Sequence, residues 1–167
     1  EFDIGWMYIT IMQAVGLAKV KKTPPKAAYG DVRPVADEKT LEALIANRYE
    51  IMATYAKGVR QAARDEFESM KARSADAAAI KAARRWMHRD ADKVPASAVP
   101  QLAQARAASP VLDKMVTMRE ELRQLWLNTS ASREHLATDL QGWCHRAEAS
   151  GIAALQEFSL RLRAARA

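Results

Sequence analysis

Apolar side chains recur at steps of three and four residues along one long stretch of the chain. This spacing places them on one face of an α-helix, which completes a turn every ~3.6 residues. Charged side chains occupy the opposite face. The pattern predicts one helix over residues 38–73, with Asp37 as its N-cap. The stripe consists of Leu41, Leu44, Ile45, Met52, Tyr55, Val59, Ala63, Phe67 and Met70.

Alanine supplies 34 of the 167 residues, and it is the strongest helix former. Similar stripes and start signals predict further helices over residues 75–90, 97–107 and 110–127. Ser74 is expected to cap the first of these, and Ser109-Pro110 marks the start of the last. Another should begin after Ser130 or Ser132 and end at Gly151, and a last helix should begin at Ile152. No segment alternates between polar and apolar residues as a strand would. The sequence therefore predicts an all-α fold of antiparallel helical hairpins, or a bundle, preceded by an apolar helix.

That apolar helix is expected at Ile4–Val20, a stretch whose only charge is Lys19. At ~1.5 Å per residue it would be about 25 Å long, short of the ~30 Å hydrocarbon core of a bilayer. It could span a membrane, lie at its surface or pack inside a protein core. Interfacial aromatic residues and a basic flank favour contact with lipid. The expected membrane-contact residues are Ile4, Trp6, Tyr8, Ile11, Lys19, Lys21 and Lys22.

Prolines divide the chain. Pro24 and Pro25 cannot continue a helix, because neither has an amide proton to donate. Three parts are expected: an apolar helix with its basic flank over residues 1–22, a proline-rich linker over residues 23–36, and a helical domain over residues 37–167.

No group of residues predicts an active site. His88, His135 and His145 are not spaced to share a metal on one helix face, and each is expected at the surface or at a helix cap. Cys144 is expected to be a buried small residue. We predict no catalytic, cofactor-binding or metal-binding residue in this chain.

Two other residue types have ordinary explanations. The carboxylate pairs Asp65-Glu66 and Glu120-Glu121 are expected to be solvated partners of nearby arginines. The tryptophans at 86, 126 and 143 lie on apolar stripes and are expected to pack in the core.

The net charge is +6, and along the sequence the excess is spread thinly. A nucleic-acid module usually gathers its basic residues on one face. A solvated surface of mixed charge is therefore expected, and nucleic acid is predicted to be an unlikely partner.

The first residues, Glu-Phe-Asp-Ile-Gly-Trp followed by Gly-Leu-Ala-Lys-Val-Lys-Lys at 16–22, resemble a segment of bacterial membrane fatty acid desaturases. The resemblance implies the C-terminal part of an oxidoreductase of lipid metabolism, which inserts a double bond into a fatty acyl chain with oxygen and a di-iron centre. It implies the bacterial inner membrane with a cytoplasmic helical tail, lipid contact through residues 1–22, and a catalytic part upstream in the same polypeptide. Since the family's iron-binding histidines have no counterparts here, this segment alone is predicted to be inactive.

The far end of the chain resembles a helical segment of insertion-sequence transposases of the DDE class. The resemblance runs from Glu121 through Trp143-Cys144-His145-Arg146-Ala147-Glu148 to Leu162. The acidic triad and the asparagine-rich final motif of those enzymes have no recognisable match in this chain. An alternative function is therefore a transposase-like helical module that binds nucleic acid. A third is a structural role in which the helices pair with a partner or self-associate.

Overall fold

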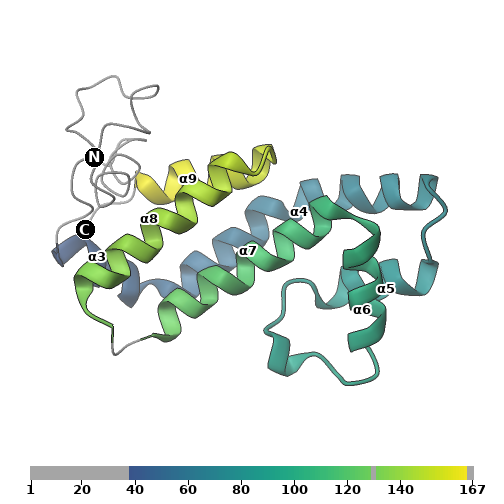
Figure 1. The fold of residues 1–167 in the computed structure, drawn as a ribbon, viewed down its shortest axis with the longest axis horizontal. Coiled ribbons are helices and arrows are strands. Elements are labelled where there is room, and N and C mark those ends of the chain that lie inside the picture. The colour runs from purple at the N-terminus through teal and green to yellow at the C-terminus, as the bar shows by residue number, and fades with distance from the viewer. Residues whose placement is uncertain (1–37, 129–130, 165–167) are drawn as a thin grey trace. The chain divides into compact units, whose positions relative to one another are not determined.

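The computed structural model describes residues 38–128 and 131–164, which form an all-α fold. Seven α-helices and one 3-10 helix occur there, and no strand is found within these ranges. This confirms the predicted fold class; the helix expected at residues 4–20 and the linker at 23–36 lie outside the described residues. The elements are α3 Glu38–Ala46, α4 Arg48–Ala72, α5 Ala77–Trp86, η1 Ala91–Lys93, α6 Val99–Ala108, α7 Pro110–Leu127, α8 Arg133–Ala149 and α9 Ala153–Arg163 (Figure 1).

The prediction of one continuous helix over residues 38–73 is wrong. The chain breaks at Asn47, which separates α3 from α4. The side-chain amide of Asn47 donates a hydrogen bond to the carbonyl of Ala43 at 2.9 Å, and Arg48 donates to the carbonyl of Ile45 at the same distance. The Ala43 carbonyl also accepts the backbone amide of Asn47 at 3.0 Å, so the Asn47 side chain adds a hydrogen bond at the break and does not replace a backbone one.

The turn between α4 and α5 also differs from prediction, since Ser74 does not cap the second helix. Ser74 ends α4 instead, in a left-handed conformation with φ of 62°. The amide of Ala75 bonds to the carbonyl of Met70 and that of Ser74 to Lys71, both at 2.9 Å, as in a Schellman motif. The N-cap of α5 is Asp76, whose carboxylate accepts a hydrogen bond from the amide of Ala79 at 2.8 Å.

Three other predicted boundaries are confirmed. The hydroxyl of Ser109 accepts from the amide of Leu112 at 3.0 Å at the start of α7. At the start of α8, the hydroxyl of Ser132 accepts a hydrogen bond from the amide of His135 at 3.1 Å. Gly151 follows α8 with a φ of 77°, a conformation that glycine adopts without strain.

Residues 55–120 form one compact unit. Most of α4 and α7 lies in it, and α5 packs against α6. The hydroxyl of Tyr55 donates a hydrogen bond to the carbonyl of Met115 at 2.6 Å and so joins α4 to α7. Its buried apolar residues include Tyr55, Val59, Phe67, Met70, Ile80, Met87, Leu112, Met115 and Met118.

Residues 38–54 and 121–164 belong to a second unit. The chain turns back after α8, so that α9 lies alongside it (Figure 1). The rings of Trp143 and Phe158 meet edge to face between the two helices, with centroids 5.7 Å apart. Leu136, Leu140, Trp143, Ala147, Leu155, Phe158 and Leu162 are buried, as their stripes predicted.

Candidate nucleic-acid interface

Positive charge is concentrated in the unit formed by residues 55–120. It holds 13 Lys and Arg against 8 Asp and Glu, a net charge of +5 out of the +6 of the whole chain. The expectation of a thinly spread charge was therefore wrong. The excess lies within one contiguous stretch of sequence, and the structure shows that this stretch forms a single compact unit.

Within this unit, α4 and α5 each carry a basic face. On α4 the cations stand three or four residues apart, and on α5 a lysine stands three and four residues before two adjacent arginines, a spacing that keeps them near one side of each helix. All of these side chains are exposed. They are Lys57, Arg60 and Arg64 on α4, and Lys81, Arg84 and Arg85 on α5.

A hollow of about 540 Å³ lies where the two helices face each other. Arg60, Arg64 and Arg84 line it, and no ion pair involves these three arginines in the part of the chain that the structure describes. The two acidic residues of the lining have other partners. Asp65 accepts a hydrogen bond from the Gln61 amide at 2.9 Å, and the Glu68 carboxylate lies 3.0 Å from the Lys71 ammonium.

An aromatic ring supports one of these arginines. The guanidinium of Arg84 lies over the ring of Phe67, 5.2 Å from its centroid. Phe67 is buried, so its position is set by the core of the unit. A fixed ring under a guanidinium attracts the cation and limits the orientations it samples.

His88 also lines the hollow and is uncharged at neutral pH. Burial, followed by the positive charges of Arg119 and Arg60, lowers the pKa of His88 from 6.5 to about 4. Its Nδ1 is buried without a hydrogen-bond partner. The expectation of a surface or capping histidine was therefore wrong at this position, because the turn after α5 half-buries His88 at the hollow.

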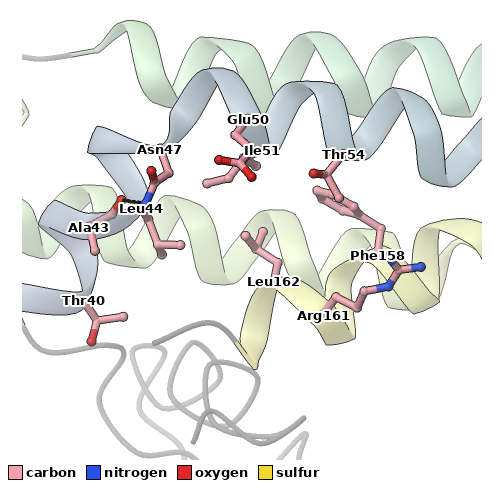
Figure 2. A pocket seen from close by; sticks show the side chains of 10 residues that line it. All are labelled: Thr40, Ala43, Leu44, Asn47, Glu50, Ile51, Thr54, Phe158, Arg161 and Leu162. Atoms are coloured by element: carbon pink, nitrogen blue, oxygen red, sulfur yellow. Dashed lines mark hydrogen bonds between the residues drawn. The ribbon is translucent and has the colours of Figure 1, made fainter. Parts of the chain in front are cut away.

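The second unit contains a different pocket, a groove of about 290 Å³ bordered by α3, the start of α4 and α9. Figure 2 shows Phe158 and Leu162 of α9 on one side and Leu44 and Ile51 on the other. Its charged lining residues are Glu50 and Arg161, and Arg161 already pairs with Glu157 at 2.7 Å. The groove is mainly apolar and lacks a set of cations like that between α4 and α5.

A buried polar network joins α8 to α9 in the same unit. The carboxylate of Glu148 accepts hydrogen bonds from Nε and Nη2 of Arg163, the latter at 2.7 Å, and from the Ser159 hydroxyl at 2.7 Å. Arg163 is fully buried. Sequence spacing does not predict this pairing, because the two charges are 15 positions apart on different helices.

The structure also shows the burial and partners of the cysteine, the other two histidines and one of the paired carboxylates. Cys144 is fully buried, and burial raises its pKa to about 12, which agrees with an unreactive thiol. His135 and His145 are exposed, and His135 lies 3.3 Å from the carboxylate of Asp139. Glu121 pairs with exposed Arg146 at 2.8 Å.

Two expectations need correction. Glu66 is mostly buried rather than solvated, because it accepts a hydrogen bond from the Ser109 hydroxyl at 2.5 Å and pairs with Arg73 at 3.1 Å. Trp143 and Trp126 are core residues as predicted, but Trp86 is only half-buried. The guanidinium of Arg85 lies over the Trp86 ring at 5.1 Å.

Neither a metal site nor a membrane-crossing helix is found in the described ranges. There, no three His, Cys, Asp or Glu side chains are grouped so that they could hold a metal ion. Among the same residues, every helix is too short or too polar to cross a membrane. The expected membrane-contact residues between Ile4 and Lys22 lie outside the described residues, and their contact with lipid stays a prediction.

A family model for the ISL3 group of DDE transposases, described as a transposase, matches residues 36–167 of the chain. No curated protein and no solved structure matches the chain significantly.

The match overturns the desaturase interpretation. The chain is not part of an oxidoreductase of lipid metabolism, and the inner-membrane location and the upstream desaturase partner lose their basis with it. The implied di-iron cofactor rested on the same resemblance alone. A short apolar stretch with a basic flank identifies a family poorly, because interfacial and core helices share that pattern. The finding favours the transposase alternative, and nucleic acid can no longer be set aside as a partner.

Proposed function

Because this chain belongs to the ISL3 group of DDE transposases, we propose that its helices form a DNA-contacting part of a transposase. The observation that carries the proposal is the paired basic faces of α4 and α5 in the unit of residues 55–120. Cleavage and joining of DNA strands are proposed for the transposase that carries these helices. The acidic triad that such enzymes use is not formed by the described residues, so none of them is assigned a catalytic step.

The proposed contact is electrostatic. Exposed lysines and arginines bind the phosphates of duplex DNA and release condensed counterions, which supplies sequence-independent affinity. Such contacts set the position of a protein on DNA but do not read bases. We propose that the α4–α5 surface holds and orients DNA, while sequence recognition is left to other parts of the transposase.

The rest of the described chain is proposed to act as a scaffold. We propose residues 37–167 as one helical domain built from antiparallel hairpins, with residues 23–36 as a linker. Self-association through these helices stays a prediction.

Salt dependence tests the proposal. Binding of the full chain to a short labelled DNA duplex is measured by fluorescence anisotropy between about 50 and 200 mM salt. Six phosphate contacts predict that affinity falls about 2,000-fold over this fourfold range, and three contacts predict about 40-fold, from a slope of ~0.9 per phosphate. No binding at low salt, or a fall of less than about fourfold, would refute the proposal.

A further inference from the structure

We propose that the hollow between α4 and α5 is a seat for one phosphodiester group of a nucleic-acid backbone, bound by Arg60, Arg64 and Arg84. This inference rests on the proposed DNA contact and sharpens it. The wider basic faces would supply general attraction, whereas this seat would fix one phosphate at a defined place on the unit.

The first argument is the convergence of three arginines on one space. Arg60 and Arg64 are four positions apart on α4 and therefore lie on the same side of it. Arg84 comes from α5, yet all three line the same hollow of about 540 Å³. Arginine presents a planar fork of donors that suits phosphate oxygens, and two such oxygens can be bound by one guanidinium.

The second argument is that these charges lack internal neutralisation. The carboxylates in the lining, Asp65 and Glu68, have partners in Gln61 and Lys71. The three arginines have no ion-pair partner among the described residues, so their donors are available to an anion from outside the chain.

The third argument is preorganisation. The buried Phe67 ring lies under the Arg84 guanidinium, so this donor loses less freedom when an anion binds. Burial, and after it the charges of Arg119 and Arg60, lower the pKa of His88 at the same hollow. The cations that both helices place there would attract an anion toward the hollow.

The test compares two triple variants of equal net charge in the full chain. R60Q/R64Q/R84Q removes the seat, whereas R133Q/R146Q/R161Q removes three arginines that pair with Glu42, Glu121 and Glu157. We expect the seat variant to lower the salt slope for duplex DNA by about 0.9, the value for one neutralised phosphate, and the control to leave the slope unchanged. Circular dichroism melting of both variants checks that they fold.

Two titrations distinguish a DNA phosphodiester from free inorganic phosphate as the ligand of the hollow. In NMR spectra of the wild-type chain, the side-chain Nε–H signals of the three arginines are followed during titration with the DNA duplex and, separately, with inorganic phosphate. Shifts of all three signals at lower concentrations of DNA phosphate than of inorganic phosphate support the seat. Shifts with inorganic phosphate alone would assign the hollow to the free ion and overturn the phosphodiester assignment.

The remaining outcomes distinguish the two proposals. If DNA binds and both triple variants have the same salt slope, the seat is wrong while the proposed DNA contact stands. If the wild-type chain does not bind DNA, the proposed function fails and the phosphodiester seat fails with it.

Discussion

The buried Glu148–Arg163 pair offers the sharpest test of the energetics of this fold. Arg163 is fully buried and Glu148 is nearly so, and its carboxylate accepts three hydrogen bonds from Arg163 and Ser159. In Glu148→Leu, the guanidinium of Arg163 would remain in the core without its carboxylate. Breaking a buried pair in this way costs about 3–5 kcal/mol, a large fraction of the ~5–15 kcal/mol that stabilises a domain.

The double variant E148L/R163M separates the two contributions to that cost. It removes both charges and fills their space with apolar side chains of similar length, a change that is often neutral or stabilising. We expect the free energy of unfolding of the double variant to lie within about 1 kcal/mol of the wild-type value. The single variant is destabilised by an unpaired charge, so the second substitution should restore most of the lost stability.

Urea unfolding followed by tryptophan fluorescence measures both variants, since Trp143 is fully buried beside Phe158 in the same hairpin. A cost below about 1 kcal/mol for E148L would refute the reasoning, because the charge could not then be desolvated as the structure shows. A double variant as unstable as the sum of its single variants would refute it as well, because the pair would not be coupled.

Three further predictions concern single residues. Ser74→Gly should raise the free energy of unfolding by about 0.5–1 kcal/mol, because glycine adopts the left-handed conformation of this site without strain. The control variant Ala53→Gly, on the exposed side of α4, should lower the free energy of unfolding by about 1 kcal/mol. Urea unfolding measures both variants. Since the folded pKa of His88 is lowered to about 4, the unfolded chain binds its proton more tightly, so the stability due to neutral His88 is complete above about pH 6.5 and is lost as the pH falls toward 4. The urea midpoint of His88→Asn should accordingly depend less on pH across that window, and equal slopes for the two proteins would contradict this. Ser132→Ala should cost about 1 kcal/mol through loss of the α8 cap, seen as a lower thermal midpoint; an unchanged midpoint would show that the cap contributes nothing.

Local signals in the sequence predicted much of the secondary structure. Ser109-Pro110, Ser132 and Gly151 act within one helical turn, so their effect depends only on neighbouring residues. The apolar stripes likewise identified the buried faces of α8 and α9, because helical periodicity is a property of the chain itself.

Local reasoning failed where competing local interactions are close in energy. At Asn47 the helix is interrupted although the apolar stripe continues across this position, and the Asn47 side chain adds a hydrogen bond to the Ala43 carbonyl. At Ser74 a non-glycine residue takes the left-handed position because the Schellman hydrogen bonds and the start of α5 hold it there. In neither case does the spacing of apolar residues predict where the helix ends.

The sequence by itself determined that the chain is helical, where several of its helices begin and which of their faces are buried, because these depend on contacts within a few residues. Only the tertiary structure decided that α4 and α5 turn three arginines toward one hollow, and that Glu148 meets Arg163 in a core. Those arrangements depend on which helices pack together. The tertiary structure also shows that residues 55–120, which carry a net charge of +5, form one compact unit.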